Sequence, residues 1–390
     1  MKSLIITDKK KKKKIDTISN IVLFAALLAV LVLIDATSNS FDMIVKVLQK
    51  GCVYAIVGVS MNLLNGFTGL FSLGQAGFML IGAYMYSIFS VSDESREMVF
   101  SFSGKPLVNF KLPIVLAIVL AGVAAAIFAF LIGLPVLKLK SDYLAIATLG
   151  FAEIMRTIIQ WDKLGRLTNG SFPISKLNSF KEVFADTPLK NMSYVVPFFV
   201  VTLICIVIIA LLIHSTYGRA FKAIRDDEVA AEAMGINLAK HKMISFVTSS
   251  FFAGIGGAMY AMYVGSTNAA PFTSALTYEI LLIVVIGGIG SISGSILAGF
   301  LYIASQEWWL RGLDSGKFLG ITSPLFRNGF RLVVFSVIIM AFVLFFRKGI
   351  MGDKEFSPVR LYNGIVSIPS KLKSTFGKLF KKSQKAEEKV

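Results

Sequence analysis

The stretch Gly218–Lys242, GRAFKAIRDDEVAAEAMGINLAKHK, separates two long apolar runs at 194–213 and 242–263. Nine of its side chains carry a charge. Each charged side chain costs about 3 kcal/mol at the centre of a bilayer, so burying the whole stretch there would cost more than roughly 20 kcal/mol. The stretch therefore lies in water or against a partner, and it joins two membrane-spanning helices.

The composition of the rest of the chain agrees with this interpretation. The chain has 390 residues, of which 55% are hydrophobic and only 16% charged, and its mean hydropathy is +0.72. A soluble protein of this size carries more charged surface, so we expect an all-α polytopic membrane protein. The formal net charge of +17 arises partly from Lys9–Lys14 and a Lys-rich tail beside apolar runs. These positions favour contact with anionic membrane lipid, and no nucleic acid partner is predicted.

Runs of apolar residues give the expected number of membrane crossings, since one crossing needs about 20 such residues. The clear candidates are 18–34, 44–64, 69–91, 112–136, 143–161, 194–213, 242–263 and 329–346. A further run at 276–309 is too long for one helix and is interrupted by GGIGSISG (Gly287–Gly294). Reading it as two short helices joined at the glycines gives about ten crossings in all.

The basic residues predict the orientation of the chain. Lys9–Lys14 place the N-terminus in the cytoplasm, and Arg347 and Lys348 place the C-terminus there too. Lys46 and Lys50 lie near the outer end of their run, where their side chains could extend to the membrane surface. The predicted organisation is a basic cytoplasmic extension at 1–17, a membrane domain at 18–346 and a basic cytoplasmic tail at 347–390. Within the membrane domain, loop 214–241 is cytoplasmic, and loops 92–111 and 162–193 are external.

The charged stretch is itself predicted to be helical. Residues 219–234 are rich in strong helix formers, and Gly235 supplies a natural helix stop. A helix of this length is about 24 Å long, enough to present a rigid face to a neighbour. Physical chemistry alone leaves two interpretations open, a solvated connector and a docking surface.

Two segments combine glycines with an apolar background. In NGFTGLFSLGQAGFMLIGAY (Asn65–Tyr84), the polar residues Asn65, Ser72 and Gln75 accompany several glycines. Interrupted helices of this kind line cavities in transporters, although small residues also allow close helix packing. Residues 276–299 form a second interrupted segment near the other end of the chain, which suggests an internal repeat.

Ionisable residues inside apolar runs are functional candidates by default. Glu153 and Arg156 are three residues apart and can pair on one face of a helix. Glu279 lies near the outer end of its helix, where it could line an entrance or extend to the surface. We take these three residues, with Asn65, Ser72 and Gln75, as candidates for lining a translocation path. A structural ion pair is the alternative for Glu153 and Arg156.

Motifs for catalysis are missing from the sequence. No GxxxxGK[ST] phosphate loop occurs, His214 and His241 lack metal-ligand spacing, and no nucleophile–base set is visible. Cys52 and Cys205 lie in apolar runs and support neither a disulfide framework nor a metal cluster. We therefore expect a protein that is not an enzyme and has no cofactor of its own.

Five blocks of sequence, in order, resemble LivM-type permeases, the membrane subunits of branched-chain amino acid ABC importers. The blocks are NLLNGFTGLFSLGQAGFMLIGAY, DYLAIATLGFAEIMR, the charged stretch with its flanks, YEILLIVVIGGIGSISGSILAG and RLVVFSVIIMAFVLFFRKGIMG. The resemblance runs from about Ile44 to Gly352. It implies that RDDEVAAEAMGIN, which begins at Arg225, is the loop that couples the permease to an ATPase. The core of that loop would be Glu228, Ala231, Glu232, Ala233 and Gly235.

The resemblance also implies partners and a location. It predicts a second, LivH-like permease, cytoplasmic ATPase subunits that bind the ATP, an external substrate-binding protein, and a bacterial cytoplasmic (inner) membrane. Related permeases carry amides, urea, sugars or nucleosides, so the substrate class stays open between these and branched-chain amino acids. An alternative of another class is a self-contained, ion-coupled secondary transporter. It would use Glu153, Arg156 or Glu279 for coupling, and 219–234 would be a connector.

Overall fold

A computed structural model of the chain describes residues 29–32, 35, 42–101, 104–139, 141–183, 194–310, 317–318, 321–322, 329–345, 349–352 and 355. The chain divides into two units, one of residues 1–31 with 355–390 and one of residues 32–354, and the helices below belong to the second. The predicted extension at 1–17, most of the run at 18–34 and most of the tail at 347–390 lie outside the described residues.

Long helices occupy the predicted apolar runs. They are α2 (Asp42–Asn62), α3 (Gln75–Ser90), α5 (Ile114–Val136), α6 (Ser141–Ile159), α9 (Val196–His214), α12 (Leu238–Val264) and α15 (Phe330–Phe345). Among the described residues, four helical stretches are each long and apolar enough to cross a membrane, namely α5, α9, α12 and the one at Met43–Phe67. The predicted all-α class is confirmed by this mostly helical fold, in which the described strands form only two-residue ladders.

The interrupted run at 276–309 forms two helices, as predicted. Helix α13 (Ser274–Gly287) is followed by α14 (Ile292–Ala304), which ends in a π-helical turn, η5 (Ser305–Trp309). Gly288 and Gly290 join the two helices with φ of +113° and +87°. Residues with a β-carbon rarely adopt these φ angles, so the two glycines determine where the helix is interrupted.

The interruption predicted within 65–84 falls just before α3, which begins at Gln75 and not at the start of the apolar run at 69–91. The preceding chain forms a π-helical turn, η2 (Leu63–Phe67), and then a non-helical segment at 68–74. Gly69 has a φ of +75°, which ends the helical path there. Hydropathy alone does not reveal this break because the non-helical segment is also largely apolar.

Helix α12 lies at the centre of the packing and contacts α2, α3 and α5. Glycines allow its backbone to approach its neighbours closely. A β-carbon on Gly257 would lie 1.9 Å from the Met79 carbonyl oxygen in α3, and one on Gly254 would lie 2.8 Å from the Ala121 carbonyl oxygen in α5. Small residues therefore hold these three helices at a distance that larger side chains would not permit.

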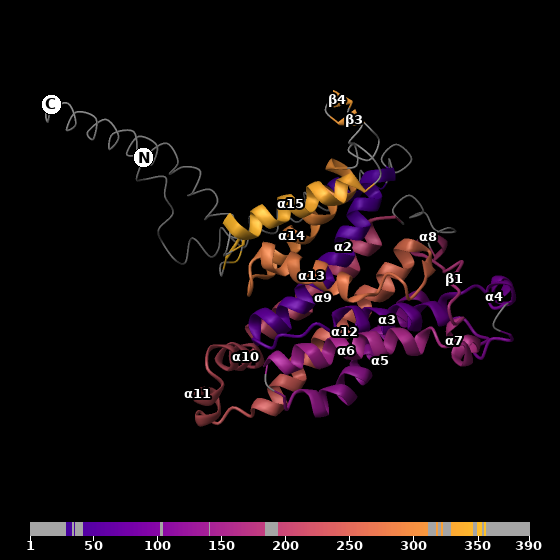
Figure 1. Ribbon diagram of the computed structural model, residues 1–390. Helices are drawn as coiled ribbons and strands as arrows, with labels where there is room; N and C mark the ends of the chain where they lie inside the picture. Colours follow the sequence, from indigo (N-terminus) through magenta and orange to yellow (C-terminus); the bar gives the residue numbers. More distant parts are fainter. Residues whose placement is uncertain are drawn as a thin grey trace, which may run out of the picture. The chain divides into compact units, whose positions relative to one another are not determined.

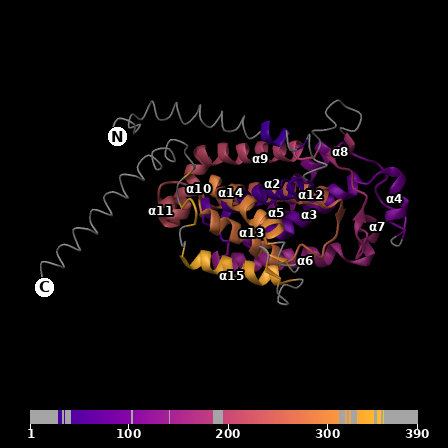
Figure 2. The ribbon, with the colours of Figure 1, turned by 90° about the horizontal axis from the view of Figure 1, so that it is seen from above.

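The two kinds of predicted loop lie at opposite ends of this unit. Figures 1 and 2 both show α4 and α7 at one end and α10 with α11 at the other. The first end carries α4 (Asp93–Val99), η3 (Asp162–Leu164), α7 (Gly165–Thr168), β1 (Ile174–Ser175), which pairs antiparallel with β2 (Ser266–Thr267), and α8 (Phe180–Val183). A second antiparallel pair consists of β3 (Lys317–Phe318) and β4 (Ile321–Thr322). Arg96 is buried in α4 and donates to the carbonyls of Val91 and Phe110, which holds loop 92–111 together.

Candidate coupling and translocation sites

The charged stretch forms two helices, α10 (Thr216–Asp226) and α11 (Glu228–Ala233), so the predicted single helix at 219–234 is wrong. The break is at Asp227, whose backbone is extended with φ of −161° and ψ of 113°. Its carboxylate accepts hydrogen bonds from the backbone N–H groups of Val229 at 2.9 Å and Ala230 at 3.0 Å. Asp227 thus caps α11 and starts a new helix in place of continuing the old one.

The predicted stop at Gly235 is confirmed. Its φ is +82°, and its N–H donates to the Glu232 carbonyl oxygen at 2.9 Å. The next N–H, of Ile236, donates to the Ala231 carbonyl oxygen at 3.1 Å. This pair of bonds is a Schellman motif, which satisfies carbonyl groups at the end of α11. A β-carbon on Gly235 would meet nothing within 4 Å, so the surface here is open.

Helix α11 presents apolar side chains outward. Val229 is 78% exposed and Met234 is 83% exposed, whereas Ala231 is buried. Of the other predicted coupling residues, Glu232 and Ala233 are exposed, and Glu228 forms an ion pair with Lys242 of α12 at 2.6 Å. Singly exposed apolar residues are common on protein surfaces, but two large ones around one short helix leave apolar area that a partner protein can cover.

Arg225, predicted to belong to the same coupling surface, has its guanidinium directed into the permease. Its Nη1 donates to the carbonyl oxygen of Gly66 in η2 at 3.0 Å. Its Nε and Nη2 contact Asp226 Oδ1 at 3.3 and 3.2 Å. The end of α10 is therefore hydrogen-bonded directly to the first glycine-interrupted segment.

Asn62, which the sequence analysis overlooked, connects the two glycine-interrupted segments. Its Nδ2 donates to the Ser291 carbonyl oxygen at 2.9 Å and to Ser295 Oγ at 2.8 Å. Its Oδ1 accepts from the Gly290 N–H at 2.8 Å. Asn62 is fully buried at the end of α2. The available signal was an amide side chain, next to a glycine-containing segment, at the end of a run predicted to be apolar.

The predicted path residues in 65–84 make hydrogen bonds within the protein. Asn65 Oδ1 accepts from the N–H of Ser72 at 3.2 Å, which closes the non-helical loop. Gln75 Nε2 donates to Ser60 Oγ at 2.6 Å, and both Ser72 and Gln75 are buried. These contacts give the three residues a structural role in the present conformation, and their contact with cargo stays a prediction.

Glu153 and Arg156 pair on α6 as their spacing suggests. Arg156 Nε donates to Glu153 Oε2 at 2.8 Å, and the two side chains are 30% and 36% exposed. Ile154 and Ile158 beside them are exposed. A partly exposed ion pair on an apolar helix face is costly against lipid, so this face is better suited to protein or water.

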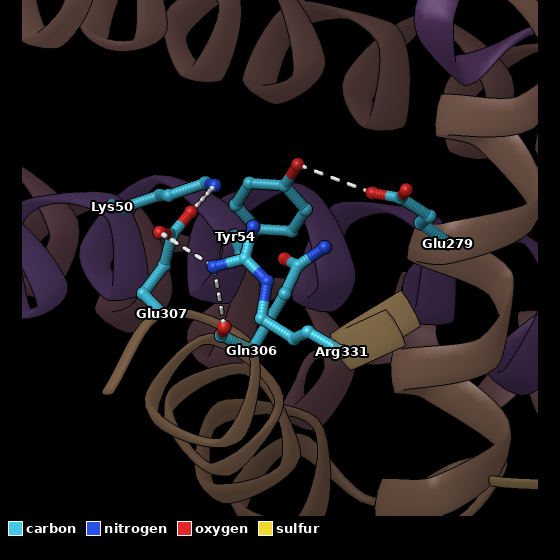
Figure 3. A network of polar contacts seen from close by, with 6 residues as sticks. All are labelled: Lys50, Tyr54, Glu279, Gln306, Glu307 and Arg331. Carbon is cyan, nitrogen blue, oxygen red and sulfur yellow. Dashed lines mark hydrogen bonds and ion pairs between the residues drawn. The ribbon is translucent and has the colours of Figure 1, made fainter. Parts of the chain in front are cut away.

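Glu279 lies in a polar network in which residues of four elements meet, shown in Figure 3. Tyr54 donates to Glu279 Oε2 at 3.4 Å. Lys50 Nζ is 2.5 Å from Glu307 Oε1, and Arg331 Nη1 is 3.9 Å from Glu307 Oε2. Lys50 is thus paired with a residue of η5, whereas the sequence suggested that it extends to the membrane surface. The network joins α2, α13, η5 and α15.

Comparison with known families agrees with this arrangement of helices. Residues 43–346 match the family described as "Branched-chain amino acid transport system / permease component". The chain belongs to this family. The predicted resemblance is therefore confirmed, and the chain is a multi-pass membrane permease component.

Individual permeases are also similar in sequence to this chain. The "High-affinity branched-chain amino acid transport system permease protein LivM" of Escherichia coli K12 is 32% identical over 275 residues, 65% of this chain and 61% of that protein. The "Probable branched-chain amino acid transport permease protein LivM" of Methanocaldococcus jannaschii is 24% identical over 357 residues, 85% of this chain and all of that protein. The E. coli K12 protein named LivH is 21% identical over 316 residues, 79% of this chain and 94% of that protein.

The match to the E. coli LivM permease covers only 61% of that protein's length. No solved structure matches the chain.

Proposed function

We propose that this permease forms, with a second related permease, the translocation path of an ABC importer for branched-chain or related amino acids. An external binding protein delivers the substrate, and cytoplasmic ATPase subunits bind and hydrolyse ATP. The chain crosses a bacterial cytoplasmic membrane about ten times, with both ends in the cytoplasm. The names of the relatives support the substrate class and the partnership with a LivH-like permease.

The observation that carries this proposal is the geometry of α11. The helix is capped at both ends, by Asp227 and Gly235, and it exposes Val229 and Met234. A solvated connector would have no need of two caps or of exposed large apolar side chains. An ATPase that binds this surface would move a rigid element of the permease.

The movement of α11 reaches the membrane helices through α10. Phe221 and Ile224 of α10 are buried, and α10 contacts both α9 and α12. Closure of the ATPase pair would therefore tilt α9 and α12 and alternate access to a path lined in part by 65–84 and 276–299. Glu153, Arg156 and Glu279 are candidates for contact with the substrate along this path.

The test is uptake by the purified complex in proteoliposomes. Labelled leucine, with the binding protein on the outer side, should accumulate only when ATP is present on the ATPase side. An imposed proton or sodium gradient without ATP should give no uptake. Uptake driven by the gradient in vesicles that lack ATPase would favour the ion-coupled transporter. ATP-driven uptake of amides, urea or sugars in place of leucine would support the ABC importer mechanism with a different substrate class.

A further inference from the structure

We propose that Arg225 is a positioning residue that transmits the movement of α10 and α11 to both glycine-interrupted segments of the permease. This inference rests on the proposed function, since it needs an ATPase that moves α11. The sequence places Arg225 in the loop that faces the ATPase, but its guanidinium makes its hydrogen bond to the membrane domain. The inference therefore assigns Arg225 to the permease side of the coupling segment.

The guanidinium is held from two sides. On the inner side, Nη1 donates to the Gly66 carbonyl oxygen at 3.0 Å. On the outer side, the more exposed carboxylate of Asp226 accepts from Nε and Nη2. Hydrogen bonds from a charged donor are shorter and stronger than neutral ones, and the planar guanidinium fixes their direction. A displacement of Arg225 is therefore transmitted through a directional hydrogen bond to one particular carbonyl group. The buried apolar side chains of α10 have no such directional contact.

The stem of Arg225 lies against glycine backbone. A β-carbon on Gly69 would lie 2.9 Å from Arg225 Cγ, and one on Gly290 would lie 3.2 Å from Nη1. Gly69 and Gly290 belong to different interrupted segments, and both have positive φ. Arg225 thus contacts both segments at once, in space that exists only because these residues lack side chains.

The two segments are also joined to each other. A β-carbon on Gly66 would lie 1.9 Å from Asn62 Oδ1 and 2.7 Å from the Gly290 nitrogen. Asn62 binds Gly290, Ser291 and Ser295 through its amide. We call Asn62, Gly66, Gly69, Gly290 and Ser291 the glycine junction. A displacement of Gly66 would shift the turn between α13 and α14 with it.

The junction is a suitable place for a movement to act. Segment 68–74 is not helical, so its backbone lacks the regular hydrogen bonds that stiffen the helices on either side. Lys222 provides a second link from α10, with Nζ 5.6 Å from the centre of the Phe67 ring. Hinges in proteins are a few residues at element ends that absorb backbone changes, as residues 66–69 and 288–290 are placed to do.

The experiment compares Arg225→Gln with Arg219→Gln in the complete complex. Arg219 lies on the same helix and is exposed, and its substitution by Gln removes the same charge. In the part of the chain that the structure describes, Arg219 makes no contact with the junction. For each variant we would measure copurification of the ATPase, ATP hydrolysis and leucine uptake per ATP hydrolysed. Coupling free energies between sites typically correspond to factors of about 5 to 150, so uptake per ATP should fall at least about 5-fold in Arg225→Gln. Copurification and hydrolysis should persist, and Arg219→Gln should behave as wild type.

The ratio of uptake to hydrolysis does not depend on how much complex folds, so a merely structural role would leave it unchanged. If the Arg225→Gln protein cannot be produced as a folded complex, the same measurements on Arg225→Lys test the inference. Lysine keeps the charge and loses the guanidinium geometry. It too should lower the ratio. A wild-type ratio in Arg225→Lys or Arg225→Gln would overturn the inference, as would loss of ATPase copurification, which would place Arg225 in the docking surface. Failure of the proposed function would be separate, because the wild-type protein would then show no ATP-driven uptake.

Discussion

The glycine junction and the network around Glu307 are both polar regions within a hydrophobic protein, but their contacts differ in kind. Asn62 in the junction and Arg225 beside it bind mainly backbone groups of other segments, at 2.8–3.0 Å. In the network, Lys50 and Arg331 reach a shared side chain, Glu307, at 2.5 and 3.9 Å, and Arg331 also donates to the Gln306 carbonyl oxygen at 3.1 Å. The junction mainly fixes the positions of backbone segments, and the network mainly pairs long charged side chains.

This difference indicates how each region responds to movement. A side chain bonded to backbone moves when that backbone moves, so the junction transmits displacement. Long charged side chains keep their pairing through rotamer changes, so the network can hold α2, η5 and α15 together while their spacing changes. We infer that the junction is the less tolerant of substitution, and the following changes test that order.

The largest effect is expected for Gly66→Ala. The added β-carbon would lie 1.9 Å from Asn62 Oδ1, so the end of α2 and the turn at Gly290 must separate. Overpacking of this kind costs about 1–3 kcal/mol of stability. We expect loss of uptake and a lower thermal midpoint of the purified protein. The matched control is Gly150→Ala in α6, where a β-carbon meets nothing within 4 Å. A Gly66→Ala variant with wild-type uptake would show that the junction has room to adjust.

The next effect concerns the coupling surface. Gly235→Trp, or the double reversal Glu228→Lys with Glu232→Lys, should leave the permease inserted but abolish substrate-stimulated ATP hydrolysis. Trp at position 235 blocks an open surface, and its φ of +82° also strains the residue by about 1–2 kcal/mol. The assay is ATP hydrolysis by the reconstituted complex with and without loaded binding protein. Normal stimulation in both variants would exclude α11 as the docking surface.

The smallest effect is expected in the charged network. Lys50→Met alone removes the nearer of the two cations that face Glu307, and Glu307→Gln alone removes the carboxylate that Lys50 contacts, whereas the double variant leaves neither of the pair charged. We therefore expect the double variant to be more stable than the sum of the single effects predicts, by about 0.5–3 kcal/mol in a double-mutant cycle. Thermal unfolding of the purified variants provides the cycle. Strict additivity would mean that the ion pair contributes nothing to holding α2 against η5.

The sequence was sufficient for much of the fold because hydropathy, charge and helix propensity are local properties. It predicted the helices, the division at Gly287–Gly294 and the stop at Gly235. It did not reveal the break at Asp227, although Asp is a preferred N-cap residue, because strong helix formers lie on both sides of it. It also missed Asn62, because the partners of that amide lie more than 200 residues away in the chain. The direction of the Arg225 side chain depends on such distant contacts too.

The most direct test of the account is the contact between α11 and an ATPase. Met234→Cys places a thiol at the exposed C-cap position of this helix, whereas the native Cys52 and Cys205 are buried. A photoreactive maleimide attached there, in the purified complex, should cross-link the permease to the ATPase subunit. The same reagent on Met98→Cys, exposed in α4 at the opposite end, should not. Cross-linking from Met98→Cys and none from Met234→Cys would contradict the account.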